Sequence, residues 1–122
     1  MANPFVHIEL QTNDLAKAKE FYGKLFDWKL EDAPMPDGKG TYTLIRTGEG
    51  TGGGMFANPD PHALSRWLTY VGVDDIAAST DKARELGATV AQDVMKVGEY
   101  GWLSVLIDPT GAVFALWKPK PM

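Results

Sequence analysis

Cysteine is absent from the 122 residues, which excludes thiol catalysis, cysteine-based zinc sites and a disulfide scaffold. No continuous apolar run approaches the ~18 residues that a membrane span needs, and the N-terminal MANPFVHIEL is neither basic nor continuously apolar. The net charge is −4 with both signs scattered, so the basic patch of a nucleic-acid-binding protein is also missing. We therefore expect a cytoplasmic protein that binds neither membrane nor nucleic acid.

Aromatic residues, in contrast, are plentiful: four Trp, four Tyr and five Phe. Such side chains either fill a core or line a pocket for a flat, apolar ligand. The length fits one domain at ~100–200 residues per domain and suffices for a real core. We expect residues 1–122 to form one domain.

The first half of the chain predicts the order β, α, β, β, β. Val6, Ile8 and Leu10 alternate with polar residues, as in a strand with one apolar face over Phe5–Thr12. Asn13 or Asp14 can then cap an amphipathic helix. The expected helix is Leu15–Phe26, followed by strands at Trp28–Glu31, Thr41–Thr47 and GGGMF (52–56), with a Pro- and Gly-rich turn at 33–40.

The second half repeats this order. A shift of 61 residues superposes the halves without a gap, placing Asp14 on Asp75 and Leu25 on Leu86. The expected elements are a strand Trp67–Val73, a cap at Asp74 or Asp75, a helix Ile76–Leu86 stopped by Gly87, and strands at Thr89–Gln92, GWLSVLI (101–107) and VFALW (113–117). We assign module 1 to residues 4–57, a linker to 58–64 and module 2 to 65–119.

The predicted fold class is α+β: two tandem βαβββ modules form a curved eight-stranded mixed sheet around a central cup, with the helices outside. Each helix covers only one face of the sheet of its own module, so the other faces need a different environment. Sheets that curve toward each other would enclose a cup, and the polar side of FVHIELQT would point into it.

The sequence resembles the vicinal oxygen chelate superfamily, which includes glyoxalase I, extradiol dioxygenases and the bleomycin-resistance proteins. Three segments carry the resemblance: VHIELQTNDLAKAKEFYGKLFDWKL, VGVDDIAASTDKARELGA and SVLIDPTGAVFALWKP. The last, a strand followed by DPTG and another strand, is the most specific. The resemblance covers nearly the whole chain and implies a homodimer, in some members with swapped modules.

Enzymes of that superfamily hold a divalent metal with one side chain on the first and one on the last strand of each module. The corresponding positions here are His7, Gly54 (Met55 if the register slips by one), Leu68 and Ala115. A catalytic metal ordinarily needs about three protein ligands. Of these residues only His7 can serve, so we expect no metal site of the family type and no cofactor.

His7 and Glu9 stand two apart on one strand and therefore point the same way. They are the candidate catalytic pair, since a histidine beside a carboxylate can act as a general base or supply two metal ligands. The alternative is a hydrogen-bonded polar pair inside a solvated cup. The segment TGEGTGGG lacks GK[ST] and leads into no helix. We interpret Gly52–Gly54 as a strand that widens the cup or lets a ligand approach the backbone, or alternatively as a bulge or a mobile edge strand.

Strand parity selects the remaining side chains of the expected cup. If Ala115 faces the cup, so does Trp117, whereas Phe114 and Leu116 pack under a helix. Trp28 and Trp67 fall on the helix side or at the module edge. A cavity with aromatic walls and a few polar groups suits a small planar ligand. The predicted ligand-binding residues are His7, Glu9, Gln11, Thr43, Phe56, Tyr70, Trp102, Ser104 and Trp117.

The function that these patterns favour is binding of a small organic ligand, an aromatic or planar metabolite or antibiotic, by a protein of the glyoxalase/bleomycin-resistance class. The alternative is a glyoxalase-like lyase, isomerase or dioxygenase that uses His7 and Glu9 with or without a divalent metal. A third possibility is a cup filled by its own aromatic side chains, in a protein that acts through its surface. The sequence leaves open whether the protein is an enzyme and what its ligand is.

Overall fold

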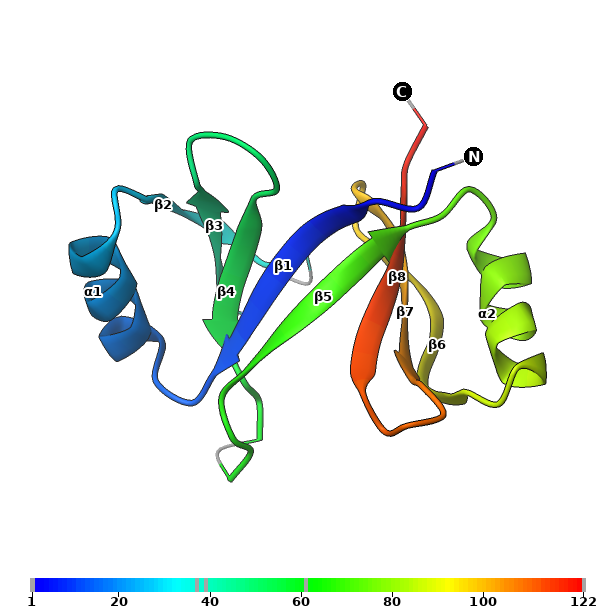
Figure 1. Cartoon of the computed structure of the whole chain (residues 1–122). Helices are drawn as coiled ribbons and strands as arrows, with labels where there is room; N and C mark the ends of the chain where they lie inside the picture. Colours follow the sequence, from blue (N-terminus) through cyan, green and yellow to red (C-terminus); the bar gives the residue numbers. More distant parts are fainter. Residues whose placement is uncertain (1, 37, 39, 61, 122) are drawn as a thin grey trace. The chain divides into compact units, whose positions relative to one another are not determined.

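The computed structural model describes residues 2–36, 38, 40–60 and 62–121 of the chain. These residues form eight strands and two helices in the order β, α, β, β, β, taken twice (Figure 1). The elements are β1 (Phe5–Thr12), α1 (Leu15–Leu25), β2 (Lys29–Pro34), β3 (Thr41–Arg46), β4 (Gly53–Ala57), β5 (Arg66–Gly72), α2 (Ile76–Glu85), β6 (Thr89–Val97), β7 (Gly101–Ile107) and β8 (Val113–Pro119). The α+β class and the repeated βαβββ order are confirmed.

The chain divides into two compact units. The N-terminal unit is His7–Leu68, and the C-terminal unit is Thr69–Met122 together with Met1–Val6. The boundary falls inside β1 and inside β5, so each of these strands contributes to both units. The single-domain assignment and the cup between the modules stay predictions.

In the N-terminal unit the strand order is β2-β3-β4-β1. β1 runs parallel to β4, with Glu9 beside Gly54, and the other neighbouring pairs are antiparallel. Helix α1 covers one face of this sheet. The core under it consists of Leu10, Ile45 and Met55, against which Leu15, Ala18, Tyr22, Trp28 and Leu30 pack.

The C-terminal unit repeats this arrangement with the order β5-β8-β7-β6. β5 runs parallel to β8, while β8, β7 and β6 are mutually antiparallel. Helix α2 covers one face, and its core contains Ile76, Leu106 and Leu116. Phe114 packs against that core, so the predicted placement of Phe114 and Leu116 under a helix is confirmed.

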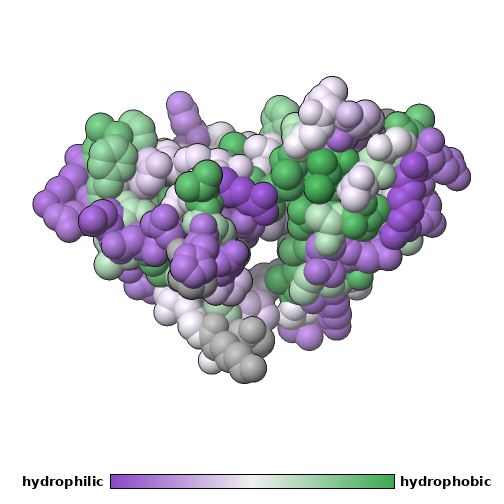
Figure 2. All heavy atoms as spheres, turned by 90° about the horizontal axis from the view of Figure 1, so that it is seen from below, coloured by the Kyte–Doolittle hydropathy of each residue, from purple (hydrophilic) through white to green (hydrophobic). Residues whose placement is uncertain are grey.

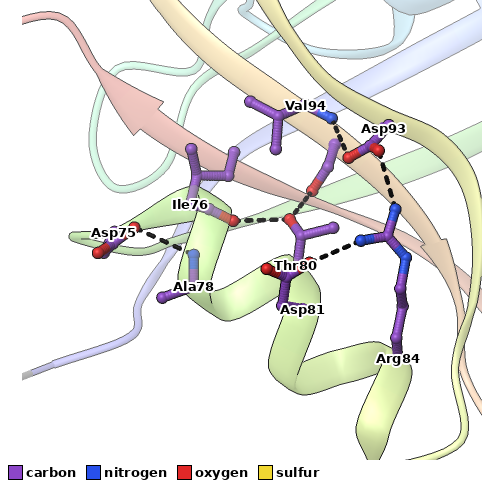
Figure 3. Close-up of polar contacts among 9 residues, drawn as sticks. Asp75, Ile76, Ala78, Thr80, Asp81, Arg84, Asp93 and Val94 are labelled. Carbon is purple, nitrogen blue, oxygen red and sulfur yellow. Dashed lines mark hydrogen bonds and ion pairs between the residues drawn. The ribbon is translucent and has the colours of Figure 1, made fainter.

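Both helices start with the same cap. The carboxylate of Asp14 accepts a hydrogen bond from the backbone N–H of Lys17, and that of Asp75 accepts one from Ala78 (Figure 3). An aspartate at this position satisfies a backbone donor that the first helical turn leaves without a partner. After α2, Gly87 adopts φ +102°, a conformation that side-chain-bearing residues rarely adopt, which explains the glycine at the predicted stop.

The structure differs from the sequence prediction mainly in module 2. β6 extends to Val97 instead of ending near Gln92, because irregularities in its pairing with β7 let the strand continue beyond the first break in alternation. In the predicted turn at 33–40, Ala33 and Pro34 instead belong to β2, because they pair with β3, and Asp37 and Lys39 lie outside the described residues, as does Pro61 in the predicted linker. The linker contains tight turns in which Asn58 and Asp60 side chains accept backbone hydrogen bonds.

Among the described residues, neither helix has the length and apolarity that would carry it across a bilayer. Hydrophobic residues do reach the surface on the α1 side, next to hydrophilic ones (Figure 2). They include Phe21, Leu25 and Phe26, which are 57%, 56% and 44% exposed.

Candidate functional site

The sheet of the N-terminal unit has a polar face opposite α1. Leu10 and Met55 point toward the helix, so Glu9 and Gly54, which are their chain neighbours and pair with each other across β1 and β4, lie on the other face. His7 and Gln11 share that face because they are two residues from Glu9. The prediction that His7, Glu9 and Gln11 point the same way, away from the helix, is confirmed.

Tyr42 on β3 crosses this face to reach them. A Cβ atom at Gly54 would lie 2.2 Å from the hydroxyl and Cε2 of Tyr42, so the ring lies over the bare backbone of β4. The tyrosine hydroxyl ends at β1, 2.6 Å from His7 Nε2 and 3.0 Å from Glu9 Oε1. Glycine is therefore required at position 54 for the tyrosine to lie there, and the space that we interpreted as a widening of the cup is filled by Tyr42.

The hydrogen bonds of the Tyr42 hydroxyl run in one direction. Tyr42 has a single phenolic proton, which it donates to Glu9 Oε1. The phenolic oxygen then accepts a hydrogen bond from His7, which assigns a proton to Nε2 of the imidazole. The carboxylate of Glu9 is buried, with an exposed fraction of 7%, and Gln11 Nε2 donates to its other oxygen over 3.2 Å.

Burial lowers the pKa of His7 below its ordinary value, and the nearby charge of Glu9 only partly opposes this shift. The planes of the His7 and Tyr42 rings differ by 22°, and their centroids are 6.2 Å apart. Because the rings touch through Nε2 and the hydroxyl oxygen, they lie end to end and nearly coplanar. Together they form one flat surface on the sheet that carries a neutral imidazole.

Arg66 continues the same chain of polar contacts at the start of β5. Its Nε donates to Gln11 Oε1 over 2.9 Å, and Gln11 in turn donates to Glu9. The described contacts therefore run from Arg66 through Gln11 and Glu9 to Tyr42 and His7. We call these five residues the polar chain.

Phe56 supplies apolar surface beside the polar chain, whereas Leu68 is buried. Phe56 on β4 pairs with Gln11 on β1. The centroids of the Phe56 and Tyr42 rings are 6.0 Å apart, and the ring planes differ by 28°. Leu68 is 1% exposed and shares the strand parity of Arg66. Trp28 and Trp67 instead contact Tyr22 on the α1 side, as predicted.

Three predicted ligand-binding residues point the wrong way. Thr43 is fully buried and donates to Asp32 Oδ1, and Asp32 binds Lys19 of α1, so Thr43 lies on the helix face. Ser104 is also fully buried, and its hydroxyl lies 2.9 Å from Thr80 Oγ1 of α2. Trp102 packs against the core under α2.

These errors have one cause. The prediction places the hydroxyls of Thr43 and Ser104 in a polar cup, and Trp102 shares the strand parity of Ser104. A hydroxyl costs little in a core when a partner on the adjacent helix satisfies it, so it is no evidence of a pocket. Parity counted from the apolar Ile45 would have placed Tyr42 on the polar face. Sequence reasoning missed Tyr42 and Arg66, and this count was the available signal for Tyr42.

The C-terminal unit carries the remaining predicted aromatics. Tyr70 pairs with Ala115 across β5 and β8, on the face opposite the core residue Val71. The centroids of the Trp117 and Tyr70 rings are 6.3 Å apart and the ring planes differ by 76°, which is an edge-to-face contact. Tyr70 is 5% exposed, so most of its ring is already in contact with protein.

The residues at the family's metal positions do not fit a divalent metal. Gly54 lies on the same face as His7, which excludes the one-residue slip to Met55, a core residue under α1. Glycine has no donor side chain, and neither Leu68 nor Ala115 has one. The Nε2 of His7 bears a proton toward Tyr42, so it presents no lone pair at that nitrogen.

Two groups of curated proteins are similar to the chain. “Putative glyoxylase CFP32” of Mycobacterium tuberculosis and of Mycobacterium bovis is 37% identical over 115 residues, which cover 91% of this chain and 44% of the relative. The anthracycline biosynthesis protein DnrV of Streptomyces peucetius is 28% identical, over 93% of this chain and 46% of the relative. The chain thus spans about half the length of the curated relatives that it matches.

Solved structures share the fold at low sequence identity. Methylmalonyl-CoA epimerase from Mycobacterium tuberculosis superposes with a TM-score of 0.72 at 17% identity, covering 96% of this chain and 88% of that one. The hypothetical protein BH1468 from Bacillus halodurans superposes with a TM-score of 0.77 at 15% identity, covering 100% of this chain and 98% of that one. A family model described as Glyoxalase/Bleomycin resistance protein/Dioxygenase superfamily matches residues 5–116. The chain therefore belongs to the glyoxalase/bleomycin resistance protein/dioxygenase superfamily.

Proposed function

We propose that the protein binds a small, planar organic molecule on the polar face of its N-terminal unit, without a metal of the family type. The observation that carries this proposal is the Tyr42 hydroxyl placed between His7 and Glu9, over Gly54. Glycine at position 54 has no side chain that could bind a metal, and the phenol of Tyr42 from β3 occupies that space instead. The site thereby has hydrogen-bonding groups and a flat aromatic surface, which are what recognition of a planar ligand requires.

The names of the relatives support a small-molecule function but not one reaction. One group is named for glyoxylase and the other for anthracycline biosynthesis, and each match covers less than half of the relative. A fold alone does not specify chemistry. We therefore base the ligand class on the residues of the polar face.

Nuclear magnetic resonance of the isotopically labelled chain with a library of small aromatic compounds tests the proposal. We expect binders to shift the imidazole resonances of His7 and the ring resonances of Tyr42 and Phe56. Tyr42→Phe should weaken those binders, whereas Tyr100→Phe, which changes an exposed ring in the C-terminal unit, should not. A library whose binders leave His7, Tyr42 and Phe56 unmoved would contradict the proposal.

The metal-free part of the proposal has its own measurement. We expect the purified protein to contain less than stoichiometric divalent metal by elemental analysis, with the same content in His7→Ala. Stoichiometric metal that disappears in His7→Ala would show that the donor set includes His7 after all.

A second function is favoured by the direction of the hydrogen bonds. A proton accepted by the imidazole of His7 can pass through the Tyr42 hydroxyl to Glu9, so the three side chains form a path for general acid–base catalysis of an isomerase or lyase type. Compounds with acidic C–H bonds, incubated with the protein in D₂O, would then take up deuterium. Uptake that is lost in both His7→Ala and Glu9→Gln would favour the enzyme over the binding protein.

We also propose that the chain forms a homodimer. Its curated relatives are about twice as long as the matched region, so a second copy would supply a comparable length of chain. Sedimentation equilibrium should give twice the 13.3 kDa chain mass, and a monomer at the highest soluble concentration would contradict this.

A further inference from the structure

Arg66, the arginine of the polar chain, differs from the other arginines in its partner. The other two arginines have carboxylate partners: Arg46 pairs with Glu31, and Arg84 pairs with Asp81 and Asp93. Arg66 has no carboxylate partner in the part of the chain that the structure describes, and its side chain is exposed. The guanidinium is nevertheless oriented, because its Nε is held by Gln11 Oε1 at 2.9 Å.

That orientation leaves the two terminal nitrogens of the guanidinium without a protein acceptor among the described residues. A guanidinium held at Nε presents these nitrogens as a planar fork, which matches the two oxygens of a carboxylate. The carboxylate nearest along the polar chain, that of Glu9, is already bonded to Gln11 and Tyr42. A negatively charged group on a ligand is therefore the partner that fits the terminal nitrogens of Arg66.

Arg66 lies at the Gln11 end of β1, and His7 lies at the other end of the same face. Gln11, which holds Arg66, and His7 are four residues apart on β1, which at the usual rise of a strand places their Cα atoms about 13 Å from each other. The Tyr42 ring lies over Gly54, which pairs with Glu9 midway between Gln11 and His7, and the Phe56 ring lies next to that of Tyr42, so the two rings provide the flat part of the surface. A ligand that contacts both ends must therefore be elongated as well as planar.

Resting on the proposed function, we propose that the ligand is an elongated planar molecule with a carboxylate at one end, bound by Arg66, and a neutral polar group at the other, bound at His7. A neutral imidazole with a bound phenol favours an uncharged hydrogen-bonding group at its end, whereas the guanidinium favours the charged one. Compounds of three or four carbons are too short to contact both ends.

Three probes separate charge from length. 4′-Hydroxybiphenyl-4-carboxylate has both end groups, its carboxamide lacks the charge, and 4-hydroxybenzoate has the same end groups on one ring only. We expect calorimetric titration to show the biphenyl carboxylate binding at least about tenfold more tightly than either of the others, since a charge-assisted pair is roughly twice as strong as a neutral one.

Arg66→Gln should remove the preference for the carboxylate over the carboxamide, while Arg66→Lys, which keeps the charge but not the fork, should retain part of it. Arg46→Gln is the matched control, because it removes one positive charge from the same unit at a residue already paired with Glu31. It should leave the preference unchanged.

The outcomes distinguish this inference from the proposed function. Equal binding of carboxylate and carboxamide, or an unchanged preference in Arg66→Gln, would overturn the role of Arg66 while binding at His7 and Tyr42 stands. No binding of any of the three probes to the wild-type protein would also overturn the inference. The aromatic library of the previous section decides separately whether the face binds planar molecules at all.

Discussion

The two modules are alike on the sheet face that the helix covers and differ on the opposite face, which we call the open face. At the shift of 61 residues, Ile45 corresponds to Leu106 and Met55 to Leu116, and all four are core residues under a helix. Even the buried hydroxyls correspond, since Thr43 and Ser104 are both fully buried and both hydrogen-bonded. The packing that builds the βαβββ unit is thus present twice.

The open faces carry opposite chemistry at the same positions. In module 1 these positions hold a histidine, a carboxylate and a phenol that are hydrogen-bonded to one another, and in module 2 they hold mostly apolar side chains. The pairs are His7 and Leu68, Glu9 and Tyr70, Tyr42 and Leu103, Gly54 and Ala115, and Phe56 and Trp117. The hydrogen-bonded group of His7, Tyr42 and Glu9 therefore occurs on one copy of the repeated scaffold, and the glycine at position 54 is what admits Tyr42.

The largest effects should come from breaking the part that the modules share. Ile45→Ala and Leu106→Ala should each lower the free energy of unfolding by about 2–5 kcal/mol, because each leaves a cavity in a packed core. Urea denaturation measures both losses. A loss below about 0.5 kcal/mol for either variant would contradict the equivalence of the two cores.

The buried hydroxyls sharpen the comparison. Thr80→Val should cost about 1–3 kcal/mol, since it leaves the buried Ser104 hydroxyl without its partner. Thr43→Val should cost less, because the partner that it leaves, Asp32, is solvent-accessible and still bound by Lys19. The double variant Thr80→Val/Ser104→Ala should recover part of the loss in urea denaturation, and no recovery would show that the hydroxyls do not act as a pair.

The open face of module 1 should respond to Gly54→Ala. The added methyl meets the end of the Tyr42 ring, which can move, so we expect a loss of about 1–2 kcal/mol with the fold retained and the His7–Tyr42 contact broken. Changed imidazole resonances of His7 are the diagnostic signal. Ala115→Gly, the corresponding change in module 2, should leave those resonances unchanged. An unaltered His7 spectrum in Gly54→Ala would mean that Tyr42 does not depend on the glycine.

The smallest expected effect is a pH dependence confined to module 1. Burial lowers the folded-state pKa of His7, so the unfolded chain binds a proton more readily than the folded one. Stability should therefore fall as the pH drops through the ordinary histidine value of about 6.5 toward the lower folded value, and this residue should contribute no slope above that range. Comparing the urea midpoints of wild type and His7→Gln between pH 8 and 5 isolates the contribution of His7 to this pH dependence. A steeper fall in His7→Gln than in wild type would contradict the sign.

The fold could be predicted from the sequence because its signals are local. Alternation in FVHIELQT, the Asp14 and Asp75 caps and the glycine after the second helix each specify an element within a few residues. The end of β6 could not be predicted, because its pairing irregularities depend on a neighbouring strand. On the polar face, His7, Glu9 and Gln11 of β1, whose alternation is regular, and Phe56 of β4 were predicted, whereas Tyr42 of β3 was not.

The sequence by itself determined the duplicated βαβββ order, the helix positions and the direction of His7, Glu9 and Gln11, because each follows from the periodicity of a single segment. Only the tertiary structure decided that Tyr42 reaches His7 and Glu9 across Gly54, that Arg66 is held by Gln11, and that Thr43 and Ser104 serve their helices. These contacts join residues that are 11 to 55 positions apart, and their partners are set by strand pairing and by the space that one glycine leaves.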